Sequence, residues 1–183
     1  TAKALTVTGL SASDKPYDGN TTASVTGTAA LVGVVAPDSV NVSGSPVGTF
    51  STSTVGSNTV TVTGLSLGGG DETNYSLTQP TLNASITAKP ITVTPNVGQS
   101  KVYGAVDPTI TYTNTALIGG DVFTGALSRA VGGNVGTYAI TQGTLALSAN
   151  YAITLSPETF EITAKPIIVT SSSTQTKVYS NNS

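Results

Sequence analysis

Thr87-Ala88-Lys89-Pro90-Ile91-Thr92-Val93 has close copies at Thr1–Val7 and at Thr163–Val169. Twelve residues after the lysine of each copy stands a second lysine, with a tyrosine two positions further on: Lys15/Tyr17, Lys101/Tyr103 and Lys177/Tyr179. An internal repeat of this length indicates an array of small structural units and not a single scaffold built around one active site. The sequence therefore predicts a module at 1–88, a second at 89–164, and the first strand or strands of a third at 165–183.

The segments around these phrases alternate apolar residues with threonine or another small residue. Thr59–Thr63, Ile91–Thr94, Thr109–Thr113 and Tyr151–Leu155 all follow this period of two, which is typical of strands with one buried face. Clusters of Gly, Asn, Asp and Pro separate the alternating runs and indicate turns. We therefore expect all-β, Thr/Gly-rich modules, sandwich-like or β-grasp-like. Short helical turns are expected only at Ala29–Val34 and Asp121–Leu127.

The two full modules can be aligned on each other. Asn74–Leu77 matches Asn150–Ile153, and Val55–Val60 matches Val135–Ile140, so one topology is expected for both. Loops such as Leu67–Thr73 account for the difference in length.

Very little chain separates one module from the next. Only Ala88 and Lys89 lie between the predicted closing strand at Ser85–Thr87 and the opening strand at Pro90–Val93. A joint this short, followed by a proline that fixes φ, cannot act as a flexible tether. We therefore expect the modules to lie end to end as a semi-rigid rod, and the third opening segment to pack on the second module unless the boundaries are permuted. The residues predicted to hold turns and joints are Tyr17, Asp18, Gly19, Lys89, Pro90, Tyr103, Gly104, Lys165 and Pro166.

Composition excludes several classes of function. The chain has no His and no Cys, its net charge is −2, and only 9% of its residues are charged. The common general bases and thiol nucleophiles are therefore missing, and no basic surface is available to neutralise nucleic-acid phosphates. The sequence contains no run of about 18 apolar residues, which is the length that a membrane-spanning helix needs. We expect a protein that is not an enzyme, has no cofactor, binds no nucleic acid and does not insert into a membrane through this segment.

Several motifs together resemble a known pair of repeat families. The first module resembles the YDG-type repeat of large bacterial surface adhesins, through Lys15–Ala23, Asn74–Leu77 and Ile86–Lys89. The second resembles the related MBG repeat of the YGX type, through Lys101–Gly104, Asp107-Pro108, Gly125–Arg129, Asn134–Tyr138 and Asn150-Tyr151. In the third copy, Tyr179-Ser180 departs from the expected Tyr-Asp-Gly or Tyr-Gly.

The resemblance implies a function and a location. Such repeats form stalks in long exported proteins of the filamentous-haemagglutinin kind, on the bacterial cell surface, and no catalytic residues come with the family. The partners implied are neighbouring repeats of the same long chain.

Three alternatives remain beside the stalk. Tyr17, Tyr103 and Tyr179 could form a row of aromatic rings that binds host or matrix glycans or mucin, although a tyrosine beside a tight turn more commonly caps the core with its hydroxyl on a backbone group. A calcium ion could bind Asp14, Asp18 or Asp107. A lysine at a joint could form an isopeptide bond with Asn74 or Asn150. We favour none of these, and we predict no metal site.

Overall fold

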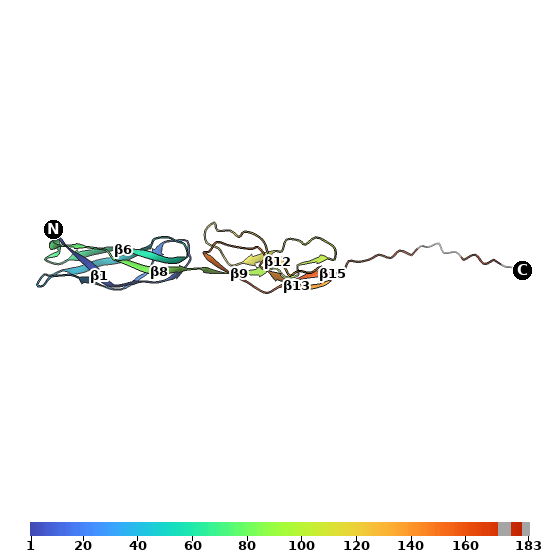
Figure 1. Ribbon diagram of the computed structural model, residues 1–183, viewed down its shortest axis with the longest axis horizontal. Helices are drawn as coiled ribbons and strands as arrows, with labels where there is room; N and C mark the ends of the chain where they lie inside the picture. Colours follow the sequence, from blue (N-terminus) through green and yellow to red (C-terminus); the bar gives the residue numbers. More distant parts are fainter. Residues whose placement is uncertain (172–176, 181–183) are drawn as a thin grey trace.

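The computed structural model describes residues 1–171 and 177–180, and its strands, from Lys3 to Thr163, form two β modules lying end to end (Figure 1). The first contains β1 (Lys3–Ala12), β2 (Lys15–Pro16), β3 (Thr22–Ala23), β4 (Val25–Val32), β5 (Asn41–Phe50), β6 (Gly56–Gly68), the 3-10 turn η1 (Glu72–Asn74), β7 (Tyr75–Leu77) and β8 (Thr81–Thr87). The second contains β9 (Lys89–Pro95), β10 (Ser100–Val102), β11 (Tyr112–Asn114), β12 (Ser128–Arg129), β13 (Gly136–Thr141), β14 (Tyr151–Leu155) and β15 (Thr159–Thr163). The prediction of an all-β fold is confirmed.

Each module is built from two sheets with the same strand order. In the first module the sheets run β4-β1-β7 and β2-β8-β6-β5-β3, and in the second they run β11-β9-β14 and β10-β15-β13-β12. Each strand of the second module thus has a counterpart in the first, and β3 is the one strand of the first without a counterpart in the residues described. The predicted common topology is confirmed.

The register between strands is also the same. The parallel pair β1/β7 aligns Lys3 with Tyr75, and the pair β9/β14 aligns Lys89 with Tyr151. The antiparallel pair β6/β8 aligns Gly56 with Ile86, and β13/β15 aligns Gly136 with Ile162. Because a slip of one residue would turn every side chain to the opposite face, this identity shows that both modules bury equivalent faces.

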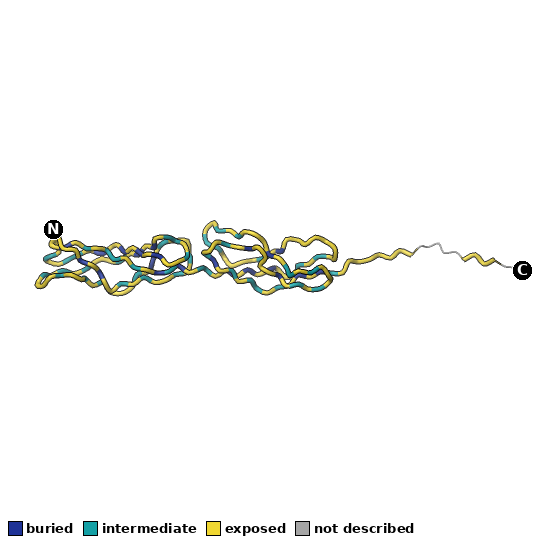
Figure 2. Tube along the Cα trace, in the orientation of Figure 1, coloured by how far each residue is buried: buried dark blue, intermediate teal, exposed yellow. Residues whose placement is uncertain are grey.

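The two sheets of each module enclose the core, so the modules are sandwiches. In the first module Val7 of β1 packs with Val62 and Leu65 of β6, from the other sheet. In the second, Ile91 of β9 packs with Phe160 of β15. Buried residues run along the interior of both modules (Figure 2). The alternation read from the sequence therefore places one face of each sheet in the core.

Two expected helical turns are wrong. Ala29–Val34 begins inside β4, where Ala29 and Leu31, two residues apart, both pack on the core as a pleated strand requires. Asp121–Leu127 is an extended loop in which Thr124 bridges to Ala146. The helical turn found in the described part of the chain is η1. None of the helical structure described there is long and apolar enough to cross a membrane.

The expectation that the third opening segment packs on the second module is also wrong. Residues 164–171 form no strand and extend away from the module (Figure 1), and Ile167 is 86% exposed. Its counterpart in the sequence, Ile91, lies in β9, which pairs with β11 and β14 of its own module. No strand of the described residues pairs with 164–171. Part of the predicted third repeat, 172–176 and 181–183, lies outside the described residues.

Candidate interface between the modules

The two modules meet where one strand passes almost directly into the next. β8 ends at Thr87 and β9 begins at Lys89, so Ala88 is the single residue between them. On one side the Tyr17 amide donates to Thr87 O at 2.8 Å, and on the other the Lys89 amide donates to Asn150 O at 2.9 Å. Pro90 pairs with Ala152 inside the parallel ladder of β9 and β14. Backbone hydrogen bonds thus fix the chain up to the joint on both sides.

Tyr17 extends from the first module into the second. Its ring lies edge-on to the Tyr151 ring, with the centroids 5.4 Å apart, and packs against core residues of both modules. Its hydroxyl donates to Asp121 Oδ2 at 3.2 Å, and the Tyr151 hydroxyl donates to the same oxygen at 2.7 Å. An edge-on aromatic pair and a shared carboxylate acceptor therefore link the modules.

Two further contacts close the interface. The Val55 amide of the first module donates to Asn150 Oδ1 of the second at 3.0 Å. Gly19 lies against Ile118, and a Cβ at Gly19 would stand 2.8 Å from Ile118 Cγ2. Gly19 also has φ +80°, which side-chain-bearing residues rarely adopt, so glycine is favoured there for two independent reasons.

The environment raises the pKa of both interface tyrosines above the ordinary value. Burial, and next the hydrogen bond to Asp121, raise the pKa of Tyr17. The same two causes raise the pKa of Tyr151. Both hydroxyls therefore remain hydrogen-bond donors through the whole neutral range.

A tyrosine–aspartate pair also stands at the same place in the first module. The Tyr75 hydroxyl donates to Asp38 Oδ2 at 2.8 Å and accepts from the Val35 amide at 3.0 Å. In the second module the Tyr151 hydroxyl donates to Asp121 and accepts from the Ile118 amide at 2.9 Å. Each module thus carries this pair at its N-terminal end, and in the second module the pair also receives Tyr17.

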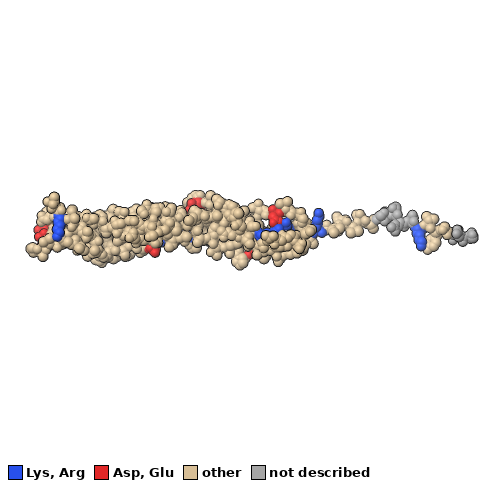
Figure 3. All heavy atoms as spheres, viewed as in Figure 1, with Lys and Arg blue, Asp and Glu red and all other residues tan. Residues whose placement is uncertain are grey.

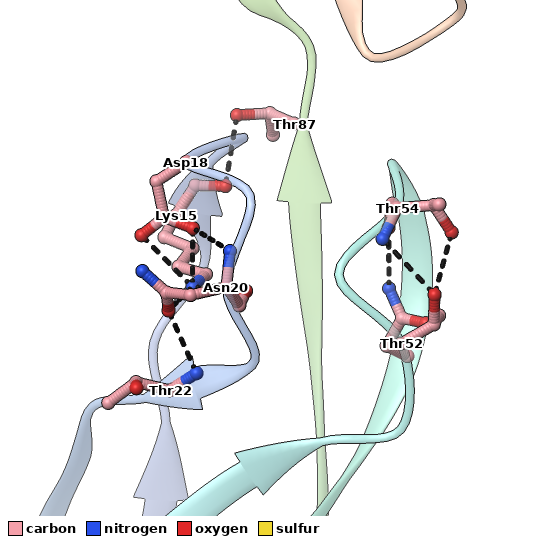
Figure 4. Close-up of polar contacts among 8 residues, drawn as sticks. Lys15, Asp18, Asn20, Thr22, Thr52, Thr54 and Thr87 are labelled. Carbon is pink, nitrogen blue, oxygen red and sulfur yellow. Dashed lines mark hydrogen bonds and ion pairs between the residues drawn. The ribbon is translucent and has the colours of Figure 1, made fainter. Parts of the chain in front are cut away.

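Lys15, two residues before Tyr17, organises the neighbouring turn. Lys15 Nζ lies 2.8 Å from Asp18 Oδ1 and 2.9 Å from Asn20 O (Figure 4). This arrangement fixes the turn that carries Tyr17, while the Thr87 hydroxyl bonds to Lys15 O. The hydrogen bond from Lys15 is the largest of the causes that lower the pKa of the Asp18 carboxyl.

The second module fixes its corresponding turn with different partners. Lys101 Nζ bonds to Ala105 O at 3.0 Å and forms an ion pair with Asp107. The Arg129 guanidinium binds both oxygens of Asp107, at 2.8 and 3.1 Å. The hydrogen bonds from Arg129, and then from Lys101, lower the pKa of Asp107.

The carboxylates considered for calcium have protein donors as partners. Asp18 and Asp107 bind the cations described above, and Asp14 Oδ1 accepts from the Ser85 amide at 2.6 Å. Within residues 1–171 and 177–180, no three metal-ligating side chains form a group. Charged side chains are sparse on the face shown in Figure 3. For the isopeptide alternative, such a bond needs buried partners, whereas Lys3, Asn74 and Lys165 are exposed and Lys89 and Asn150 are only half-buried.

The structure separates the predicted turn and joint residues into two sets. Tyr17, Asp18, Gly19, Lys89 and Pro90 lie at or beside the interface. Tyr103, Gly104, Lys165 and Pro166 lie at the far end of the second module.

Sequence reasoning missed part of this interface and mistook one contact. Asp121 and Ile118 were not identified as interface residues, because they stand about a hundred positions from Tyr17 in a loop with no strand pattern. The expected bond from the Tyr17 hydroxyl to a backbone group is wrong, since the hydroxyl binds a carboxylate of the next module. The recurring Asn-Tyr pair at Asn150-Tyr151 was the available signal.

The fold and the interface together define a class of protein, the tandem β-sandwich repeat. Residues 1–82 match the family model of the YDG domain, and residues 91–161 match that of the MBG domain (YGX type). The first module is therefore similar to the YDG domain and the second to the MBG domain, and the two modules are called by these names below. Both are non-catalytic repeat domains of the kind found in adhesins. No curated protein is matched by the chain.

Proposed function

We propose that the chain is a spacer in the stalk of an exported bacterial cell-surface adhesin, and that it projects a distal binding region away from the cell. The two domain families support this proposal, because both occur in adhesin-type repeats. The low content of charged residues and the lack of His and Cys fit a mechanical role better than a chemical one.

The interface between the domains is the observation that carries the proposal. A single residue joins β8 to β9, and the contacts of Tyr17 with Asp121 and of Val55 with Asn150 cross the joint. A short joint with cross-joint hydrogen bonds restricts bending, whereas a flexible linker of Gly and Ser would permit it. A stalk needs this restriction, because a freely jointed chain would collapse toward the cell.

Glycan binding is less well supported. A repeated glycan-binding surface requires that both domains expose a patch of Tyr with Asn or Asp at the same position. Tyr17 is half-buried in the interface, whereas Tyr103 is exposed, so the two equivalent tyrosines do not present the same surface. Binding of the purified chain to a glycan array would revive this alternative.

Distance measurement between spin labels tests the spacer proposal. The chain has no Cys, so Thr73→Cys in η1 of the first domain and Val131→Cys in a loop of the second place two labels at exposed positions. A compact globule of this length has a radius of gyration of about 16 Å and a diameter of about 40 Å. We expect a single narrow distribution well beyond that diameter.

The matched control carries Tyr17→Ala and Asn150→Ala with the same labels. Loss of both cross-joint contacts should broaden the distribution. A mean distance below about 40 Å, or a distribution equally broad with and without the two substitutions, would refute the rod.

A further inference from the structure

We propose that the far end of the MBG domain is a docking surface for the N-terminal end of a further MBG-type repeat, held by the same contacts as the YDG–MBG interface. This surface, called here the distal surface, presents Tyr103, Asn134, Val135 and Ala164 of the MBG domain, and the segment that follows covers part of it with Lys165 and Ile167. The inference rests on the proposed spacer function and names the partner and the contacts that would extend the rod.

The backbone of the distal surface reproduces that of the first interface. The Tyr103 amide donates to Thr163 O at 2.8 Å, as the Tyr17 amide donates to Thr87 O. The strand pairing is the same, because Lys101 aligns with Ile162 as Lys15 aligns with Ile86. Tyr103 therefore occupies the place in the MBG domain that Tyr17 occupies in the YDG domain.

The distal surface also has a counterpart of Val55, the residue whose amide bonds to Asn150 across the first interface. Val135 precedes Gly136, as Val55 precedes Gly56, and both glycines have strongly positive φ, +150° and +140°. Since Gly136 and Gly56 pair with equivalent positions of β15 and β8, Val135 occupies the place of Val55. The distal surface thus presents the tyrosine and the valine amide of the first interface in the same register.

The two surfaces differ in what packs against them. At the first interface Tyr17 lies under Tyr151 and Ile118 of the next domain. At the distal surface Tyr103 is 49% exposed and Val135 is 57% exposed, around a mainly apolar hollow. An apolar hollow between an aromatic ring and a valine is the complement of the aromatic and aliphatic side chains that cover the first interface.

The residues after the distal surface indicate which repeat fits. Lys165-Pro166-Ile167 matches Lys89-Pro90-Ile91 of the MBG domain, whereas the YDG domain begins Lys3-Ala4-Leu5. Ile91 is completely buried in the MBG core, but Ile167 is almost fully exposed. An MBG-type repeat that uses Ile167 in its own core would bring its counterparts of Asp121 and Asn150 to Tyr103 and Val135.

Tandem duplication of the MBG domain tests the inference in the full chain. A copy of residues 89–164 is inserted between Ala164 and Lys165, with Val131→Ala in the copy so that the peptides spanning residues 131 to 140 differ in mass between the two domains. Val131 is fully exposed, so this change is silent for folding. We expect amide hydrogen exchange at Val135 of the original domain to slow roughly five- to tenfold relative to the 183-residue chain, as a new hydrogen bond to Asn150 Oδ1 of the copy requires.

The matched variant is Asn150→Ala in the copy only, which removes the side-chain acceptor but keeps the backbone carbonyl that binds Lys89. It should return Val135 to its original exchange rate. Protection of the copy's Ile140 amide, which donates to Glu158 O at 2.8 Å in the MBG domain, reports that the copy is folded in each chain.

Equal exchange at Val135 with and without the duplication, or protection that survives Asn150→Ala in the copy, would overturn the inference. Either result leaves the spacer proposal standing if the spin-label distance in the 183-residue chain is long and narrow. A compact distance there removes the spacer proposal itself, so the two failures are distinguishable.

Discussion

The YDG and MBG domains share a register near the interface but differ in the length of their strands. β5 and β6 of the YDG domain have 10 and 13 residues, whereas their counterparts β12 and β13 have 2 and 6. The YDG domain has a core cluster near the interface, around Phe50, and a separate one around Val62, while the MBG core is a single cluster around Phe160. The two sandwiches thus share one topology but differ in the length of their strands.

The difference indicates where the repeat is constrained. Tyr17 and Tyr103, and likewise Gly56 and Gly136, hold equivalent positions in the two domains despite the difference in strand length. The turns that carry the tyrosines use different ion pairs, yet the tyrosine amides make the same backbone hydrogen bond. The position of the surface that meets the next domain is therefore kept, while strand length and turn chemistry vary.

The largest expected effect comes from emptying one core at a time. Phe160→Ala should destabilise the MBG domain by about 3–5 kcal/mol, because a fully buried ring leaves a cavity. Phe50→Ala should do the same to the YDG domain. Denaturant titration followed by residue-resolved NMR assigns each transition to a domain. A loss of equal size in both domains from either substitution would contradict their separate cores.

A smaller effect is expected at the long strands that distinguish the YDG domain. Gly44 has φ +92°, and a Cβ there would meet Gly64 O at 2.1 Å, beside a bulge in the β5/β6 ladder. Gly44→Ala should cost the YDG domain about 1–3 kcal/mol, as expected for a strained backbone. Gly70→Ala is the control, since nothing lies within 4 Å of its Cβ position. Thermal unfolding of the two variants should differ, and equal midpoints would contradict the backbone clash.

One substitution removes a hydrogen bond that crosses the interface between the two domains. Asn150→Ala should speed hydrogen exchange of the Val55 amide roughly five- to tenfold, because its acceptor across the joint is lost. Asn74→Ala removes the equivalent side chain at the N-terminal end of the YDG domain and should leave the Val55 amide unchanged. If Asn74→Ala speeds exchange as much as Asn150→Ala does, the effect is general destabilisation and not loss of the interface contact.

The smallest effect concerns pH and the two lysine turns. The folded-state pKa values of Asp18 and Asp107 are lowered below the ordinary value of 3.8, so the stability they add is present above that value and is lost as pH falls through the folded-state pKa. The effect is modest because both carboxylates are partly exposed and screened by salt. Unfolding between pH 5 and pH 2 should show each domain losing stability in acid.

Asp107→Asn sharpens that measurement. It should flatten the acid response of the MBG domain and leave that of the YDG domain intact. An acid response of the MBG domain that does not change in Asp107→Asn would show that other carboxylates govern it.

Much of the architecture follows from the sequence. The alternation of apolar residues with threonine reports one buried face per strand, which is why the all-β class and the common strand alignment could be predicted. The repeated Thr-Ala-Lys phrase lies between two alternating runs, so the short joint could be predicted too. The recurring Lys-x-Tyr and Asn-Tyr pairs marked the right positions, although their partners were not identified.

The sequence by itself determined the all-β class, the common alignment of the two modules and the shortness of the joint, because these depend on local periodicity and on spacing along the chain. Only the tertiary structure decided what Tyr17 binds. Its acceptor, Asp121, is 104 residues away, and a loop without a strand pattern carries it to the end of the sandwich. The same reason explains Ile167. A strand sequence becomes a strand only when partner strands stand beside it, and residues 164–171 have none in the structure.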